Sequence, residues 1–452
     1  MPESRCLQGI WSSPWIFICA ATGSAIGLGN MWKFPYMLGS NGGGAFLLIY
    51  FLCLVLVGLP VLMAEVALGR TVRSNPIDTV NDLAERHVVS KFWVAVPYLS
   101  GITALLILTY YSVIGGWAFA YSRHSVMGEL SGLDKMQSEG LFQSLLNAPV
   151  EMIFWHTIFM VFAVIVVGQS VTRGLSSVVQ LLIPSLLVVM LGLAIYALTV
   201  GNSADALSFM FRFDWQQVTF EVALSAIGHA LFSLGAGLGA LFAYAAYMSK
   251  RMSIAKACTI VVGLDLLVSI LVALIIFPLM FAFGIDTDSG PSLTFVTLPI
   301  IFDVLPGGQV IGPVFFVLLV LVALTSAIAM MELFVSWLHE RFYIGRLKAA
   351  FRLGLGVWFF GIGIVLSFNH WDAKILFGMN LFELVDNVTS FIMLPIAAVA
   401  LSVLVAWVLP EPMLKNELIV KTPSHFRWWY LTLKYVSIPA TVLITVAGWI
   451  GV

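Results

Sequence analysis

The sequence predicts an all-α polytopic membrane protein, because its composition is strongly apolar and long apolar segments recur along it. Of the 452 residues, 60% are hydrophobic and only 10% are charged, whereas soluble domains carry about 25% charged residues. The apolar segments are about 20 residues long, which is enough to cross a bilayer as a helix. The net charge of −1 gives no sign of a nucleic-acid partner. The expected partner of the apolar segments is a lipid bilayer.

Glycine, proline and charged clusters divide the apolar sequence into eleven expected helices within one transmembrane domain, residues 1–452. The helices are expected at residues 12–37, 42–69, 92–123, 150–168, 175–199, 221–248, 255–284, 312–338, 352–369, 380–409 and 428–450. Sixteen of the 22 Lys and Arg residues then fall in loops on the N-terminal side of the membrane, and four fall in loops on the opposite side. The positive-inside rule therefore places the N-terminus in the cytoplasm and the C-terminus outside.

Two expected helices are interrupted by glycine. The first contains G-S-A-I-G-L-G-N (23–30), and the sixth contains F-S-L-G-A-G-L-G (232–239). Dense glycine unwinds a helix, although small residues also allow close packing between membrane helices. The two breaks open corresponding five-helix halves, 12–199 and 221–409, with 428–450 as an extra helix. This arrangement predicts an inverted repeat with a binding site near the bilayer midplane.

Unwound backbone inside a membrane is tolerated only where its free amides and carbonyls find partners. The amino end of a half-helix favours a carboxylate, whereas exposed carbonyls and side-chain oxygens favour a hard cation such as sodium. The two breaks therefore predict a small charged guest, and an amino acid zwitterion together with sodium meets both demands.

Five ionisable residues fall inside the expected helices, where a charge is costly and is a candidate functional group. They are Lys33, Glu65, Asp265, Glu332 and Asp386. We interpret Glu65 as a structural support whose carboxylate accepts hydrogen bonds from the amides of the unwound segments. Lys33 and Asp386 either pair with each other or are solvated separately near helix ends.

Several motifs resemble those of bacterial members of the neurotransmitter:sodium symporter family. The motifs are G-S-A-I-G-L-G-N-M-W-K-F-P-Y (23–36), N-G-G-G-A-F (41–46), G-L-P-V-L-M-A-E-V-A-L-G-R (58–70), T-Y-Y (109–111), F-S-L-G-A-G-L-G (232–239) and L-T-S-A-I-A (324–329). The resemblance implies the leucine-transporter fold and sodium-coupled symport of amino acids by alternating access. The twelfth helix that the family often has is missing from the expected set.

The resemblance also implies two sodium sites. The first corresponds to the backbone oxygen of Ala25, the side chains of Asn30, Ser233 and Asp265, and the carboxylate of the substrate. The second corresponds to the backbone oxygens of Gly23, Ile26 and Val322 and to the hydroxyls of Thr325 and Ser326. Without the resemblance, a Thr-Ser pair in an apolar helix would be expected to hydrogen-bond to its own backbone.

Asp265 departs from the chloride-dependent relatives, many of which have asparagine there and use a bound chloride to offset the sodium charge. A fixed carboxylate supplies that charge itself. The other positions of the chloride site are Tyr50, His229, Ser233 and Ser269, with histidine where glutamine is usual. We therefore expect transport without a chloride requirement.

The substrate pocket implied by the family is lined by Ser24, Ala25, Gly27, Gly29, Ile107, Tyr111, Phe232, Gly235, Leu238, Ser326 and Met330. Glycine at position 27, where monoamine carriers have aspartate, leaves room for a substrate carboxylate beside the Tyr111 hydroxyl. The walls are apolar, and each buried methylene contributes about 0.8 kcal/mol. Hydrophobic or aromatic L-amino acids are therefore the expected substrates.

Gating roles follow from the same resemblance. Phe232 is the expected lid, and Lys33 with Asp386 is the expected outer latch. The inner mouth is assigned to Trp11, Tyr247 and Glu340. Gly174 and Pro184 match a pattern that lets the fifth helix unwind.

Other classes of protein receive less support. No HExxH, CxxC or GxxxxGK[ST] motif occurs, so the sequence does not favour an enzyme. An amino acid sensor or a channel on the same fold remains an alternative, because a sensor would keep every binding residue. Short loops favour a bacterial inner membrane.

Overall fold

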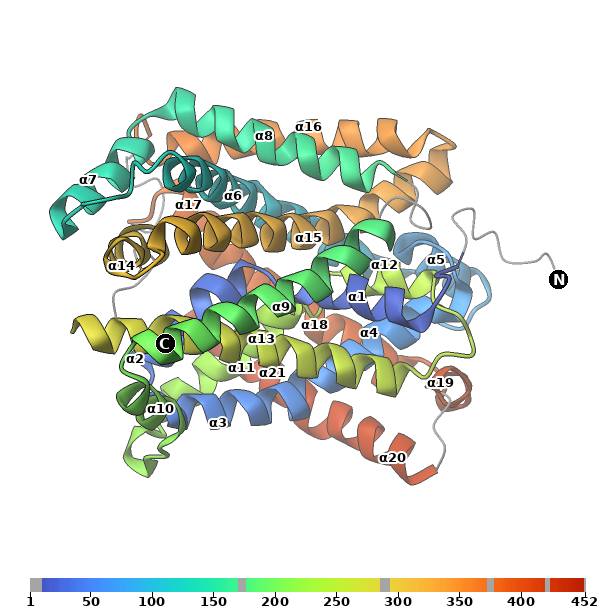
Figure 1. The fold of residues 1–452 in the computed structure, drawn as a ribbon. Coiled ribbons are helices and arrows are strands. Elements are labelled where there is room, and N and C mark those ends of the chain that lie inside the picture. Colours follow the sequence, from blue (N-terminus) through green and yellow to red (C-terminus); the bar gives the residue numbers. More distant parts are fainter. Residues whose placement is uncertain (1–9, 170–175, 285–292, 372–377, 419–422, 451–452) are drawn as a thin grey trace.

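The computed structural model describes residues 10–169, 176–284, 293–371, 378–418 and 423–450. Within these residues, nine helices are long and apolar enough to cross a membrane, and a bent pair, Pro14–Ala25 with Gly29–Ser40, makes a tenth span. The long helices lie side by side and roughly parallel (Figure 1). The all-α polytopic fold predicted from the sequence is thereby confirmed.

The first half of the chain supplies five spans. Its elements are α1 (Pro14–Ala25), η1 (Gly29–Lys33), α2 (Phe34–Ser40), α3 (Gly44–Cys53), η2 (Leu54–Gly58), α4 (Leu59–Val72), η3 (Lys91–Val94), α6 (Ala95–Val126), α8 (Pro149–Val167) and α9 (Ser176–Val200). The first span bends by 52° at its break. The break follows Ala25, because Ile26 adopts an extended conformation (ψ 109°) that ends α1.

The second half repeats the pattern of a broken helix followed by long ones. Its elements are α11 (Phe220–Leu234), α12 (Ala240–Ala246), α13 (Ile254–Phe283), α15 (Gly308–Phe342), α16 (Arg346–Leu366), α17 (Leu381–Asn387), η7 (Val388–Met393), α18 (Leu394–Val403) and η8 (Leu404–Val408). A last helix follows as α20 (Pro423–Thr432), η9 (Leu433–Ser437) and α21 (Ile438–Ile450).

The expected helix 221–248 is two short helices, and neither is long enough to be counted as a span. Gly235 and Gly239, which end α11 and begin α12, have φ of 60° and 77°. A residue with a side chain is strained in this left-handed region, so glycine permits the break. The count of spans is therefore nine plus one bent pair in the described residues, and the full set of eleven stays a prediction.

Short helices cover the two ends of the bundle, and none of them was expected from the apolar pattern. At one end lie α5 (Pro76–Glu85) and α19 (Glu411–Leu418), and at the other lie α7 (Lys135–Leu146), α10 (Ser203–Phe211) and α14 (Leu298–Val304) (Figure 1). The brief helices η5 (Trp215–Gln217) and η6 (Leu293–Thr297) lie in the connections to α11 and α14. The last transmembrane helix also begins earlier than expected, at Pro423.

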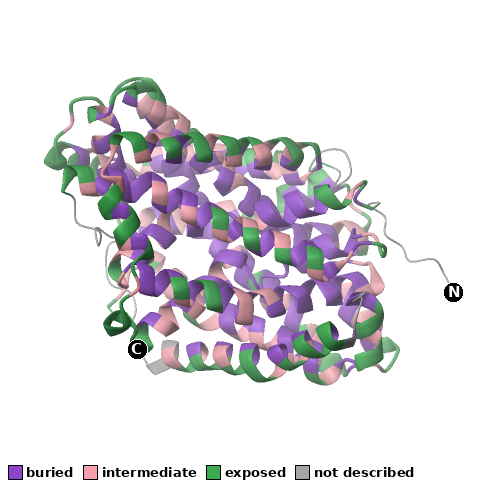
Figure 2. Ribbon diagram, turned by 60° about the horizontal axis from the view of Figure 1, so that its bottom comes forward, coloured by how far each residue is buried: buried purple, intermediate pink, exposed green. Residues whose placement is uncertain are grey.

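Buried residues concentrate in the middle of the bundle, and exposed ones follow the outer faces of the peripheral helices (Figure 2). Many exposed side chains on the outer helices are large and apolar, such as Leu181, Val188 and Phe359. An apolar outer face is what a membrane-embedded bundle presents to lipid.

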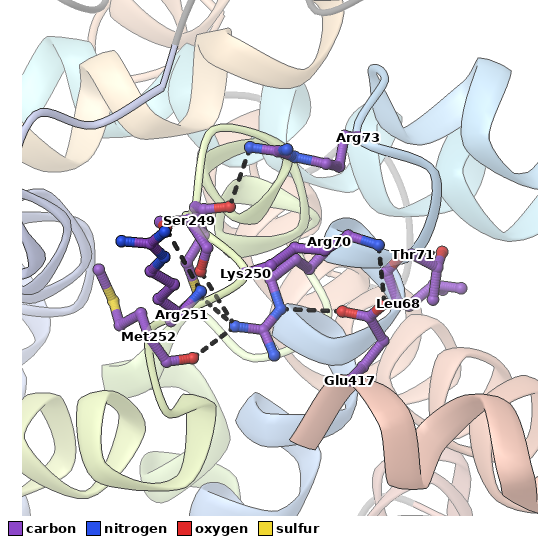
Figure 3. A network of polar contacts seen from close by, with 10 residues as sticks. Leu68, Arg70, Thr71, Arg73, Ser249, Lys250, Arg251, Met252 and Glu417 are labelled. Atoms are coloured by element: carbon purple, nitrogen blue, oxygen red, sulfur yellow. Dashed lines mark hydrogen bonds and ion pairs between the residues drawn. The ribbon is translucent and has the colours of Figure 1, made fainter. Parts of the chain in front are cut away.

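A buried arginine joins three elements at the α5–α19 end of the bundle (Figure 3). Arg70, in the last turn of α4, is fully buried, and its Nε lies 2.9 Å from a carboxylate oxygen of Glu417 in α19. Its Nη1 donates to the carbonyls of Met252 at 2.5 Å and Ser249 at 3.3 Å, both in the loop between α12 and α13. The network ties α4, this loop and α19 together.

Candidate functional site

The two broken helices meet at a buried polar cluster centred on Asp265 of α13. The Asn30 amide donates to the Asp265 carboxylate at 2.8 Å and to the Ser269 hydroxyl at 2.9 Å. Ser233 donates to the same carboxylate at 2.8 Å, and the Tyr50 hydroxyl donates to it at 3.2 Å. All five side chains are buried. The structure therefore brings together the three side chains assigned to the first sodium site.

The two helix breaks explain how Asn30 and Ser233 come to lie in this cluster. Asn30 lies in η1, just beyond the break in the first helix, and its Oδ1 accepts the amide proton of Gly27 at 3.0 Å. Ser233 lies in the last turn of α11, just before the break in the sixth helix. Each side chain thus lies next to a half-helix end, where backbone groups lack partners within the helix.

The residues assigned to the second sodium site also meet. The Ser326 hydroxyl donates to the carbonyls of Ile26 at 3.0 Å and Gly23 at 3.4 Å, which belong to the end of α1. The Thr325 hydroxyl donates to the Val322 carbonyl at 2.8 Å. Ser326 thus joins α15 to the end of α1, whereas the Thr325 bond to Val322 lies within α15, as expected of a threonine in an apolar helix.

Glu65 of α4 lies against the break in the sixth helix. Its carboxylate accepts the amide protons of Gly237 at 2.9 Å and Phe242 at 3.1 Å. Gly237 has φ of 94°, and a Cβ atom there would lie 2.8 Å from the backbone nitrogen of Ala398. The unwound segment therefore passes too close to α18 for any larger residue, and Glu65 satisfies its free amides.

Gly27 faces two hydroxyls that could hold a ligand. A Cβ atom at Gly27 would lie 2.9 Å from Ser326 Oγ and 3.0 Å from the Tyr111 hydroxyl oxygen. Tyr111 in turn accepts the Leu28 amide proton at 3.1 Å. The backbone of the first break, α6 and α15 therefore enclose a small polar space, in which a side chain at position 27 would collide with both hydroxyls.

A cavity of about 680 Å³ opens on one side of this polar space. Gly29, Tyr111 and Phe232 line its inner part, and it extends outward past Lys33 to Glu221, which is exposed. Other residues predicted for the pocket, namely Ile107, Leu238 and Met330, are buried and are not part of its lining. Ser24, Ala25, Gly27, Gly235 and Ser326 also lie outside its lining.

Lys33 and Asp386 both line this cavity, yet they do not form an ion pair in this structure. The ammonium of Lys33 instead lies 4.4 Å from the centre of the Phe232 ring. Asp386 accepts a hydrogen bond from Ser390 at 2.9 Å. The expected latch residues thus face one space without closing it, and Lys33 contacts the expected lid.

The opposite side of the polar space is closed. Trp11 is buried, its indole donates to the Tyr244 carbonyl at 3.0 Å, and its backbone N–H donates to the Tyr247 carbonyl at 2.9 Å. The Tyr247 hydroxyl donates to Glu332 at 3.0 Å. Glu332 also forms a buried ion pair with Arg346, the first residue of α16. Among the expected inner residues, Trp11 and Tyr247 therefore lie together.

Glu340, the third residue assigned to the inner mouth, contacts the segment before α5. Its carboxylate accepts hydrogen bonds from the Asn75 backbone at 3.1 Å and from the Asn75 side chain at 2.8 Å, next to the start of α5. Pro184 lies inside α9, whereas Gly174 lies outside the described residues. The partners of Glu332 were missed by sequence reasoning, although a carboxylate in an apolar helix was a signal that a buried cation was required.

Broken helices around an oxygen-rich centre, open to a cavity on one side and closed on the other, define a membrane transporter with the leucine-transporter fold. The chain belongs to the sodium:neurotransmitter symporter family, whose sequence profile matches residues 8–138 and 142–450. Sodium-coupled transport is the activity of this class.

Individual relatives agree with this assignment over nearly the whole chain. An uncharacterised sodium-dependent transporter of Bacillus subtilis, YhdH, is 32% identical over 100% of this chain and 99% of its own. One from Haemophilus influenzae is 28% identical over 96% of each chain. The crystal structure of MhsT in complex with L-phenylalanine superposes with a TM-score of 0.90, at 34% identity over 97% of this chain and 99% of MhsT.

Proposed function

We propose that this chain is a symporter that imports hydrophobic or aromatic L-amino acids with sodium, by alternating access, across a bacterial inner membrane. Its N-terminus would lie in the cytoplasm and its C-terminus outside, as the distribution of Lys and Arg predicts. MhsT, which is 34% identical to this chain, forms a complex with L-phenylalanine, and this likeness supports an aromatic substrate here.

The two hydroxyls beside Gly27 are the observation that carries the proposal. A substrate carboxylate would bind beside Gly27 to the hydroxyls of Tyr111 and Ser326, which lie within about 3 Å of the position of a Cβ atom and which a side chain there would block. An aspartate at this position would repel a carboxylate and fill the space. The site would therefore select substrates that carry a carboxylate group.

Two groups of side chains and carbonyls would hold two sodium ions, the first once the Asn30 amide, whose NH2 group faces Asp265 here, turns its oxygen toward the ion. Asn30, Ser233 and Asp265 would bind one ion, with the Ala25 carbonyl and the carboxylate of the substrate completing its shell. The carbonyls of Gly23, Ile26 and Val322 with the hydroxyls of Thr325 and Ser326 would bind the other. Sodium is a hard cation that favours such oxygen ligands, and the shared carboxylate would couple substrate to ion.

The charge of Asp265 supports independence from chloride. The carboxylate is buried and accepts hydrogen bonds from Asn30, Ser233 and Tyr50. It places a negative charge in the cluster where a sodium ion would bind, so a mobile anion is not needed for neutrality.

Competition uptake tests the substrate class. Purified protein in liposomes would take up labelled phenylalanine under a sodium gradient, with each of the other amino acids as an unlabelled competitor. We expect tryptophan, tyrosine and leucine to compete strongly, because the pocket walls are apolar. Stronger competition by glycine or glutamate would contradict the proposed class.

A further inference from the structure

Lys434 is a cation in the middle of the last transmembrane helix, and the transport site does not use it. It lies in η9, ten residues beyond Ser424, where the span Ser424–Ala447 begins. At a rise of about 1.5 Å per residue, its Cα is roughly 15 Å along the span. Among the described residues, no carboxylate oxygen lies within 4.0 Å of its ammonium. Such a charge is costly in the membrane unless an anion or water meets it.

Aromatic rings from two helices surround the ammonium. It lies 4.2 Å from the centre of the Tyr430 ring and 4.8 Å from that of Trp407. The Tyr430 hydroxyl donates to the Ala406 carbonyl at 2.9 Å, which fixes its ring against the neighbouring helix. The rings of Trp407 and Tyr435 pack edge to face, with 6.3 Å between their centres. We call Trp407, Tyr430, Lys434 and Tyr435 the lysine–aromatic cluster.

The cluster faces outward, on the surface that contacts lipid. Trp407 is 57% exposed and Tyr435 is 64% exposed. Trp407 is one residue from the end of its span, Leu381–Val408, which places the nearby ammonium at the level of the headgroups. A lysine stem leans toward the start of its own helix, so Lys434 reaches this level from deeper in the span.

Two of the six π-helical turns of the described chain meet at the same place. Lys434 lies in the π-helical turn η9 and Trp407 in the π-helical turn η8, and the two turns pack against each other. Such turns occur frequently at functional sites. Two other π-helical turns, η1 and η7, contribute Lys33 and Phe391 to the cavity of the transport site.

We propose that the lysine–aromatic cluster binds the phosphate of one anionic phospholipid. The phosphate would contact the Lys434 ammonium, while the exposed rings of Trp407 and Tyr435 would pack against the glycerol and upper acyl chain. Aromatic rings at the headgroup level and a basic pocket between helices are the features that hold anionic lipids. Ring faces attract the ammonium but do not neutralise its charge, whereas a phosphate does.

Native mass spectrometry of the full chain in detergent tests this proposal. Dioleoylphosphatidylglycerol would be titrated in, with dioleoylphosphatidylcholine as the neutral lipid and inorganic phosphate as a competitor. For the Lys434→Gln variant we expect the first phosphatidylglycerol to bind about fivefold more weakly, which corresponds to about 1 kcal/mol for one lysine at an anionic lipid. The Lys434→Arg variant should bind like the wild type.

Lys415 provides a matched control. It also lies over a ring, 5.3 Å from the centre of Phe426, but Glu411 neutralises it at 2.7 Å. Lys415→Gln should therefore leave phosphatidylglycerol binding unchanged. If Lys434→Gln fails to fold, Trp407→Leu tests the same cluster through an exposed side chain and should weaken binding of the same lipid.

Four outcomes would overturn the proposal. One is unchanged binding of phosphatidylglycerol in every folded cluster variant, and another is an equal reduction by Lys415→Gln, which would indicate general surface charge. Equal binding of phosphatidylcholine would remove the role of the anion. Displacement of the lipid by millimolar inorganic phosphate would identify a site for free phosphate.

Discussion

Most of the chemistry proposed for this protein depends on two positions. Gly27 has no side chain, and Asp265 adds a buried charge. Gly27 lies so close to the Tyr111 and Ser326 hydroxyls that a methyl group there would collide with both. Asp265 adds a buried carboxylate among Asn30, Ser233 and Tyr50. At the residue scale, the proposed specificity for a carboxylate and the proposed independence from chloride thus rest on separate groups.

Gly27→Ala should weaken substrate binding. The new methyl group would lie about 3 Å from two hydroxyl oxygens, and overpacking of this kind costs about 1–3 kcal/mol, or roughly 5- to 150-fold in affinity. Equilibrium binding of labelled phenylalanine measures the loss. Gly192→Ala is the control, because nothing lies within 4 Å of a Cβ atom there. Equal affinity of Gly27→Ala and the wild type would remove the proposed carboxylate position.

Asp265→Asn should make transport depend on chloride. Without the carboxylate, a bound anion must offset the sodium charge, so we expect uptake to fall by roughly tenfold when gluconate replaces chloride, about 1.4 kcal/mol. Wild-type initial rates should be the same in both anions. Asp205→Asn, at an exposed position, is the control. A wild type that stops in gluconate would show that Asp265 does not replace the anion.

The types of residue at the site could be predicted from the sequence, but not their partners. Asn30, Ser233 and Asp265 were expected together and lie within hydrogen-bond distance of one another. Lys33 was expected opposite Asp386, yet it lies over Phe232. A lysine stem has many rotamers, so its partner depends on the space around it and not on the spacing of residues along the chain.

At the scale of elements, the breaks in two helices depend on support from a third. The carboxylate of Glu65 accepts two amide protons from the segment around the sixth-helix break, so α4 satisfies backbone groups that an intact helix would satisfy itself. The positions of both breaks could be predicted from glycine spacing. The short helices at the two ends could not, because they are polar or too brief to show an apolar period.

Glu417→Gln should destabilise the fold by about 3 kcal/mol, because it leaves the buried guanidinium of Arg70 without its counter-charge. Arg70 has no exposed side-chain surface, and Glu417 is 10% exposed. The apparent melting temperature in detergent measures the loss.

Glu411→Gln is the matched control on the same helix. Its ion pair with Lys415 is exposed on both sides, so its loss should cost no more than about 0.5 kcal/mol. Equal melting temperatures of the two variants would show that the Arg70 network does not hold the α5–α19 end together. Arg70 and Glu417 are 347 residues apart, so no local pattern in the sequence predicts their contact.

At the scale of the whole molecule, the two ends of the bundle are unequal. The cavity reaches Gly29 and Tyr111 from one side, past Lys33 and Phe232. On the other side Trp11, Tyr247 and the Glu332–Arg346 pair close the bundle. Alternating access requires a second state with these roles exchanged, and ligands shift the balance only through different affinities for the two states.

Sodium-driven accumulation tests the central claim most directly. Purified protein in liposomes would receive labelled phenylalanine with sodium outside only, and then a sodium ionophore. We predict that the internal concentration rises above the external one and falls back when the ionophore collapses the gradient. Binding without uptake would indicate a sensor, and equilibration without accumulation would indicate a channel. Either result would contradict the proposal of a symporter.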